Sequence, residues 1–183
     1  MRIIYSIIIL LAFCSCQEND DLVISVKNVS FKAASTENEY AVPMVSTDSI
    51  SSSHFLFEVN WDIQRTDVGY DPVETTVINS NPVDSIKIWS DQIVAGRNPG
   101  NSLNTLFYQQ IYSLSVSEPD LLEENGSLIY NSSFDTFEEP LRKVSYLIPN
   151  FQINPGTYNF YFRCILRNGT ILSSSLPNVI IKQ

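Results

Sequence analysis

Cysteine and histidine are scarce in this sequence, and their scarcity leaves little material for metal or nucleophilic chemistry. The chain has 3 cysteines and 1 histidine in 183 residues. Cys14 and Cys16 are separated by one residue, whereas zinc and thiol-redox motifs place two residues between their thiols and need further ligands. His54 would have to serve alone as the base of any nucleophile–base pair. We therefore predict no catalytic residues, no metal and no cofactor.

Basic residues are also few. Lys and Arg total 11 against 20 Asp and Glu, which gives a net charge of −9. Nucleic acids and anionic membrane surfaces are bound through clustered Lys and Arg, so the composition argues against such partners. The acidic groups Asp67/Asp71 and Asp135/Glu138/Glu139 lack the ligand spacing of a known calcium loop, and we expect them to lie in solvated loops.

The apolar run at the N-terminus is too short to cross a bilayer. It extends over eleven residues, Ile3–Phe13, whereas a membrane-spanning helix needs about 20. Arg2 is the only charge before it, and small residues follow it. One basic residue, a short apolar segment and then small residues are the layout of a secretory signal peptide. We therefore predict that the chain is exported.

The two cysteines after this run decide how the signal is interpreted. The stretch resembles the signal of a bacterial lipoprotein, in which signal peptidase II cuts before a cysteine that carries diacylglycerol. Small Ser15 precedes Cys16, whereas a bulky Phe precedes Cys14. The resemblance therefore favours Cys16 as the lipid-attachment residue and residues 1–15 as the signal peptide. Cleavage there leaves Cys164 as the only thiol, so no intramolecular disulfide is expected.

An acidic segment follows the expected lipidated cysteine. It consists of Gln17, Glu18, Asn19, Asp20 and Asp21. The segment resembles the tag that directs Bacteroidota lipoproteins to the outer leaflet of the outer membrane, and anionic residues beside a bilayer keep a tether solvated. The alternative is a polar spacer on a lipoprotein that faces the periplasm. The resemblance thus implies a lipid anchor in the outer membrane, a tether at 16–21 and a folded domain at 22–183.

Alternating side chains predict β-strands over most of this domain. The clearest segment is 54–63, in which every second residue from Phe55 to Ile63 is large and apolar. The other face of that segment holds Leu56 and Glu58 among polar residues, so we expect a strand with one buried face. Weaker alternation predicts further strands at 22–32, 40–46, 83–89, 127–133 and 142–148.

The C-terminal segment predicts a β-hairpin. After the Pro155-Gly156 turn, five large or apolar residues alternate with others up to Leu166: Tyr158, Phe160, Phe162, Cys164 and Leu166. Asn168-Gly169 predicts a two-residue turn with positive φ at both positions. The return strand over 170–182 is interrupted by Pro177, which suits an edge or a bulge. Because Cys164 belongs to the apolar face, we expect a buried, inert thiol.

This hairpin resembles the last two strands of bacterial immunoglobulin-like domains, with Tyr158 near the position of the tyrosine corner. Together with its signal, the chain resembles small Bacteroidota surface lipoproteins that carry such a domain. The strand pattern and the resemblance imply an all-β fold, an immunoglobulin-like antiparallel β-sandwich of about seven or eight strands. One short helix is expected in the long excursion between the strands at 83–89 and 142–148, capped by Ser102. Its apolar face would hold Leu103, Leu106, Phe107 and Gln110.

Aromatic residues provide the candidate binding site. If Ile86 and Ile88 face the core, Trp89 faces outward just before the excursion that carries Tyr108 and Tyr112. Exposed Trp and Tyr stack on sugar rings or anchor protein partners. We therefore expect a non-catalytic binding or accessory lipoprotein that captures a glycan or contacts another surface protein. The alternative is an assembly component that pairs a sheet edge with a partner strand.

Two serines are candidate modification sites. Asp48-Ser49-Ile50 and Asp84-Ser85-Ile86 both resemble the Asp-Ser/Thr-hydrophobic acceptor of Bacteroidota O-glycosylation. Ser49 lies in a serine-rich stretch that predicts a loop, whereas Ser85 leads into a predicted strand. The resemblance implies that Ser49 is the better acceptor of the two.

Overall fold

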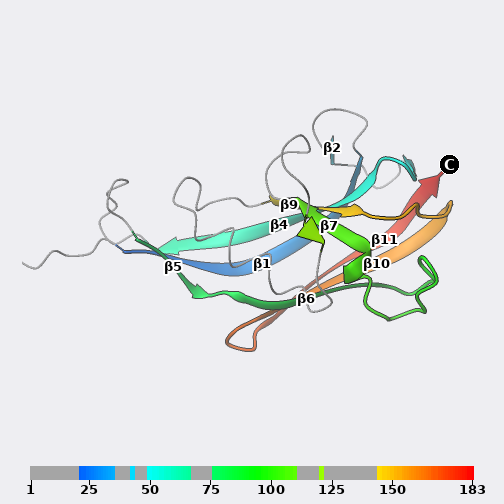
Figure 1. The fold of residues 1–183 in the computed structure, drawn as a ribbon. Coiled ribbons are helices and arrows are strands. Elements are labelled where there is room, and N and C mark those ends of the chain that lie inside the picture. The colour runs from blue at the N-terminus through cyan, green and yellow to red at the C-terminus, as the bar shows by residue number, and fades with distance from the viewer. Residues whose placement is uncertain (1–20, 36–41, 44–48, 67–75, 111–119, 122–143) are drawn as a thin grey trace, which may run out of the picture.

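Two β-sheets make up the part of the chain that the computed structural model describes, residues 21–35, 42–43, 49–66, 76–110, 120–121 and 144–183. Eleven strands in these ranges form one seven-stranded and one four-stranded sheet, which pack face to face as a β-sandwich (Figure 1). The strands are β1 (Asp21–Ser35), β2 (Val42–Pro43), β3 (Ser49–Ser51), β4 (Phe55–Thr66), β5 (Thr76–Asn81), β6 (Val83–Ser90), β7 (Phe107–Gln110), β8 (Asp120–Leu121), β9 (Val144–Pro149), β10 (Gly156–Leu166) and β11 (Ile171–Lys182). The predicted all-β sandwich is confirmed, with more strands than expected because several are only two to four residues long.

The seven-stranded sheet is built on β1 and β4, which run antiparallel from the pair Val23↔Thr66 to the pair Ser35↔Phe55. Strand order across the sheet is β2-β1-β4-β9-β7-β8, and β5 pairs parallel with the start of β1. The strand predicted at 127–133 lies outside the described residues. Of the tether, Asp21 already belongs to β1 and pairs with Thr76, so the first strand begins one residue earlier than expected.

The four-stranded sheet has the order β3-β11-β10-β6 and contains the predicted hairpin. Its turn differs from the expectation. Only Gly169 has a positive φ, +84°, and the Leu166 N–H donates to the Thr170 carbonyl at 2.9 Å. The loop therefore has three residues with glycine in the left-handed position, because Arg167 joins Asn168 and Gly169 outside the ladder.

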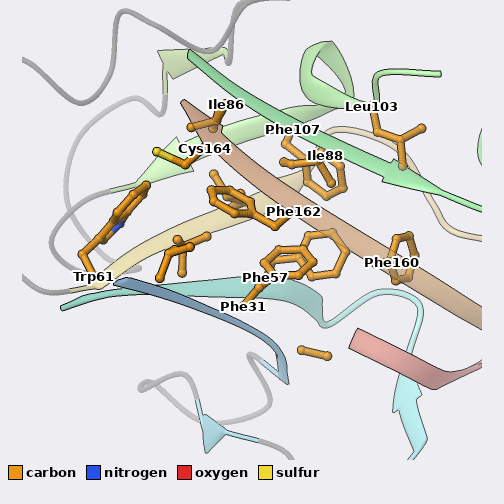
Figure 2. Close-up of a cluster of buried hydrophobic side chains, with 14 of the residues drawn as sticks. Phe31, Phe57, Trp61, Ile86, Ile88, Leu103, Phe107, Phe160, Phe162 and Cys164 are labelled. Atoms are coloured by element: carbon orange, nitrogen blue, oxygen red, sulfur yellow. The ribbon is translucent and has the colours of Figure 1, made fainter. Parts of the chain in front are cut away.

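Large apolar side chains from both sheets fill the space between them (Figure 2). Phe57 of β4 lies 4.4 Å from Phe31 and 4.8 Å from Phe160 between ring centroids. Phe160 and Phe162 are 0% exposed. The predicted inward faces of 54–63 and of the hairpin are therefore confirmed.

The outward face of β4 was expected to meet solvent, and this expectation is wrong for Leu56 and Glu58. Leu56 is 0% and Glu58 6% exposed. β4 is a central strand with β1 and β9 on its two edges, and Tyr146 stands directly opposite Glu58. The Asn60 amide donates to the Glu58 carboxylate at 2.6 Å. The side chains around a central strand thus shelter its second face, which alternation in one segment does not reveal.

A tyrosine corner fixes the entry into the hairpin. The Tyr158 hydroxyl donates to the Asn154 carbonyl, four residues upstream, at 2.9 Å. Gly156 makes room for the ring, since a Cβ at that position would lie 3.2 Å from the Tyr158 ring. Corners of this kind are a feature of immunoglobulin-like sandwiches.

The predicted short helix is largely absent. The described residues hold a single 3-10 turn, η1 (Asn104–Leu106), and the chain then enters β7 at Phe107. Strand pairing overrides the helical spacing here, because Phe107 is fully buried in the core and pairs with Pro149 of β9. Within the described residues, no helix has the length and apolar character needed to span a bilayer.

Candidate functional site

The outward face of the four-stranded sheet carries the candidate site. On β6 and β10 the core side chains alternate with outward ones, because Ile86, Ile88, Phe160 and Phe162 are buried between the sheets. Strand register aligns the outward residues in three rows across β6, β10 and β11. The rows are Trp89–Tyr161–Ser175, Lys87–Arg163–Ser173 and Ser85–Ile165–Ile171. We call these nine residues the outer face.

An aromatic pair dominates the first row. Trp89 of β6 and Tyr161 of β10 are direct cross-strand neighbours, and their rings are stacked with centroids 5.4 Å apart and an interplanar angle of 15°. Both side chains are half-buried. At this centroid separation two near-parallel rings are laterally offset, as aromatic pairs prefer. Part of each ring surface therefore remains open to solvent.

Two cations lie beside the aromatic pair. The Lys87 Nζ is 5.5 Å and the Arg163 Cζ 5.8 Å from the centroid of the Trp89 ring, within the range of a cation–π interaction. The Lys87 Nζ also donates to the Gly100 carbonyl at 2.8 Å. That hydrogen bond holds the ammonium group over the sheet and restricts its movement.

The surroundings of Arg163 are unusual. Its Nε–H is buried and has no hydrogen-bond acceptor among the described residues, and buried donors in folded proteins are normally paired. In addition, Arg163 stands directly opposite Lys87 across the ladder. Like charges in that position are destabilising. Among the described residues, no carboxylate compensates the positive charge of the second row.

A side chain closes the free edge of β6 and fixes the position of its residues. Asn104 is 0% exposed. Its amide oxygen accepts a hydrogen bond from the Ile88 N–H, and its amide nitrogen donates one to the Ile86 carbonyl, both at 2.9 Å. The Leu103 N–H donates to the Ile88 carbonyl at 2.8 Å. Asn104 thus replaces a neighbouring strand, and the segment around η1 holds β6 rigidly under Trp89.

The sequence-predicted aromatic residues are not brought together. Trp89 lies on the outer face, as alternation with Ile86 and Ile88 predicted. Tyr108 is half-buried and lies on β7 in the other sheet. Because Phe107 points into the core, its neighbour Tyr108 faces away from it on the opposite side of the sandwich from Trp89. Tyr112 lies outside the described residues.

Tyr161, Arg163 and Lys87 are site residues that the sequence alone did not predict. Alternation had already put Tyr161 and Arg163 on the non-core side of their strand. What was lacking was the pairing of β10 with β6, which sets Tyr161 beside Trp89 and Arg163 beside Lys87. That pairing is non-local and leaves no signal in either segment alone.

Of the two candidate glycosylation serines, both lie in strands. Ser49 begins β3 and pairs with Ile180 of β11, so the predicted loop is wrong at this residue. Ser85 lies on β6 opposite Ile165. Both are half-buried. The lipid-attachment residue Cys16 and residues 17–20 of the acidic segment lie outside the described residues.

The remaining titratable groups do not assemble a reaction centre in the described part of the chain. Burial first, and then the nearby Glu58 carboxylate, raise the pKa of the Tyr146 phenol. Burial raises the pKa of the Cys164 thiol to about 12, which makes it inert at neutral pH. His54 is exposed, with its Nδ1 3.3 Å from the Ser53 hydroxyl.

The described residues hold no group of three or more His, Cys, Asp or Glu side chains placed to bind a metal ion. The acidic groups at Asp67/Asp71 and Asp135/Glu138/Glu139 lie outside the described residues. The outer face is therefore the site that the described residues define best, and its chemistry is aromatic and cationic.

No protein-family model, no curated protein and no solved structure matches this chain.

Proposed function

We propose that this protein is a lipid-anchored, non-catalytic glycan-binding protein of the outer-membrane surface, and that the outer face is its binding site. The stacked pair Trp89–Tyr161 is the observation that carries the proposal. Flat aromatic rings with a partly open surface present an apolar plane to a sugar ring, and Trp and Tyr are enriched where proteins make such contacts.

The construction of the site supports binding. Trp89 and Tyr161 both come from strands, and sites on strands are held more precisely than sites on loops. Core side chains anchor the same strands from below, because Ile88 and Phe160 beside them are 0% exposed. Little conformational freedom is therefore lost when a ligand stacks on the pair, which favours affinity.

Binding is tested on a glycan array with the full-length protein in detergent, comparing wild type with two variants. Trp89→Ala removes the larger ring of the outer face, and Tyr108→Ala removes a half-buried tyrosine on the other sheet as a matched control. We expect Trp89→Ala to lose binding to every glycan that the wild-type protein binds. Tyr108→Ala should bind the same glycans as wild type. Equal binding by wild type and Trp89→Ala would refute the site.

The anchor is proposed from the lipoprotein-like signal. Lipidation at Cys16 would leave only residues 17–20 between the membrane and β1, which begins at Asp21. Cys16→Ala should release the protein from the membrane fraction and abolish labelling by a clickable fatty acid. Loss of labelling in Cys14→Ala with labelling retained in Cys16→Ala would assign the lipid to the other cysteine.

Export to the cell exterior is tested separately, through the acidic segment. Replacing Glu18, Asp20 and Asp21 by Ala should reduce accessibility to protease on intact cells, while fatty-acid labelling continues. Unchanged accessibility would show that these residues are a spacer, as in the periplasm-facing alternative.

A second candidate function, strand-edge pairing with a partner protein, is supported by β11. β10 covers one edge of β11, and on the other edge, within the described residues, strand pairing is limited to Ile180–Lys182 with β3. Near the middle of that edge, the Phe31 N–H of β1 donates to the Ser174 hydroxyl at 3.2 Å, so Ser174 is already engaged by the other sheet. An added strand pairs through backbone groups, so under this alternative an excess of a synthetic peptide with the β11 sequence would displace the partner and leave glycan binding intact.

A further inference from the structure

The second row of the outer face places two cations where the described residues supply no anion. The contacts of the Lys87 Nζ are the Gly100 carbonyl and the Trp89 ring. Arg163 contacts the same ring, and its Nε–H has no acceptor in the described part of the chain. None of the nine outer-face positions carries a carboxylate.

The acidic residues that border the outer face do not change this picture. Asp91 follows the end of β6, and its carboxylate receives the Asn159 amide at 2.8 Å. Asp84 is exposed at the other end of β6, where the pairing with β10 shifts register. The protein as a whole has a net charge of −9, so a face with two cations and no carboxylate departs from its average surface.

We call the second row of the outer face, Lys87–Arg163–Ser173, the cation row. Two of its features cost free energy in the unliganded protein. Lys87 and Arg163 repel each other as direct cross-strand neighbours, an arrangement that destabilises a sheet. The buried Nε–H of Arg163 has no acceptor among the described residues, and an unsatisfied buried donor also costs free energy. An anion between the two side chains relieves the repulsion, since Arg and Lys form strong charge-assisted hydrogen bonds with carboxylate and sulfate oxygens.

We propose that the outer face selects anionic glycans, with a carboxylate or sulfate ester bound between Lys87 and Arg163 while a neighbouring sugar ring stacks on Trp89–Tyr161. The two rows are two residues apart along each strand, roughly 7 Å, so adjacent parts of one oligosaccharide reach both. Ser173 stands beside Arg163 in the same row and offers a hydroxyl donor. This inference rests on the proposed glycan-binding function and names its ligand class.

The test uses the full-length protein in detergent and two matched pairs of probes. Trigalacturonate is compared with its neutral methyl ester, and a κ-carrageenan tetrasaccharide, whose only anionic groups are sulfate esters, with its neutral desulfated form, so that the uronate and sulfate sources of the anion are separated. We expect the charged member of at least one pair to bind at least tenfold more tightly. Raising the salt to about 1 M, where the Debye length is about 3 Å, should weaken that binding.

Charge-removing variants assign the effect to the cation row. Lys87→Gln and Arg163→Gln should each weaken binding of the charged probe by about tenfold to a hundredfold, the equivalent of losing one charge-assisted hydrogen bond. Lys27→Gln, which removes an exposed charge from β1 in the other sheet, should change it less than twofold. Arg163→Lys, which keeps the charge, should retain part of the preference. Melting temperatures of the variants show whether each one is folded.

The possible results distinguish the preference for anionic glycans from glycan binding itself, on which that preference rests. Equal affinity for charged and neutral probes, with binding still lost in Trp89→Ala, would overturn the anion preference and leave glycan binding standing. Charged-probe binding that depends on Lys87 and not on Trp89 would keep the anion site and overturn stacking. Absence of binding to every probe here and to every glycan on the array would overturn both.

Discussion

Trp89 and Tyr161 face each other across the β6–β10 ladder, with their ring centroids 5.4 Å apart and their planes at 15°. The neighbouring residues on the same strands, Ile88 and Phe160, are fully buried on the opposite side of the sheet. These four large side chains come from two pairs of adjacent residues, and strand alternation places Ile88 and Phe160 in the core and Trp89 and Tyr161 on the surface. Mutations of core residues should lower stability, whereas mutations of the surface pair should affect binding.

The first prediction concerns the core half. Phe160→Ala and Phe162→Ala should each lower the free energy of unfolding by about 3–5 kcal/mol, because they empty fully buried aromatic positions. Ile171→Ala, at a 59% exposed position of the same hairpin, should change it by less than about 0.5 kcal/mol. Urea denaturation measures all three. Losses below about 1 kcal/mol for both phenylalanines would mean that the inward face is assigned incorrectly.

The second prediction concerns the tyrosine corner. Tyr158→Phe removes the hydrogen bond from the hydroxyl to the Asn154 carbonyl and should lower the free energy of unfolding by about 0.5–1.5 kcal/mol. Tyr161→Phe is the matched control, because it removes a hydroxyl from the outer face of the same strand and should be close to neutral. A larger loss in Tyr161→Phe than in Tyr158→Phe would argue against a stabilising corner.

The third prediction concerns the closed edge of β6. Asn104→Ala leaves the Ile88 N–H and the Ile86 carbonyl unpaired inside the protein. Each unsatisfied buried group costs about 1–3 kcal/mol, so a loss of about 2–6 kcal/mol is expected. Asn101→Ala, at an exposed position of the same segment, should be nearly neutral in thermal unfolding. Similar stabilities for both variants would show that the edge does not need the Asn104 amide.

The fourth prediction concerns the Cys164 thiol, whose pKa is raised by burial to about 12. In the unfolded chain a thiol ionises near pH 8.5, so folding holds the proton and stability falls as the pH rises from about 8.5 to about 12. The slope of this loss is about 1.4 kcal/mol per pH unit.

Alkaline denaturation of wild type and Cys164→Ala measures that contribution, with Cys14 and Cys16 replaced by Ser in both. Tyr146 and Tyr158, whose pKa values burial also raises, act in the same direction in both proteins and cancel in the difference. The stability difference between the two proteins should shift in favour of Cys164→Ala above pH about 8.5. Parallel curves, or rapid reaction of the folded thiol with a thiol reagent, would contradict its burial.

Local alternation was sufficient to predict the strands and their core faces where one segment carries the whole signal. The segment around Phe57 and the hairpin strand with Phe162 are confirmed in this way. The same reasoning failed for Leu56 and Glu58, since the burial of a central strand's second face depends on neighbouring strands. It also failed at Phe107, where spacing typical of a helix yields to pairing with β9.

The candidate site could be predicted only in part. Trp89 was placed outward from its own strand, but its partner Tyr161 depends on which strand β6 pairs with. Tyr108 follows Trp89 more closely in the sequence, and it lies in the other sheet. Proximity along the chain was therefore the wrong criterion, and the register of two distant strands was the right one.

The fifth prediction tests ligand contact with Trp89 directly, through tryptophan fluorescence. The chain has 2 tryptophans, and Trp61 is buried, with its indole N–H donating to Ser145 at 3.2 Å. Trp61→Phe therefore leaves Trp89 as the only reporter. Titration of this variant with trigalacturonate and with the κ-carrageenan tetrasaccharide should change the emission saturably with at least one of them, and Trp89→Phe should show no change. Binding without a change in Trp61→Phe, or a change that persists in Trp89→Phe, would contradict the proposal that the outer face binds the glycan.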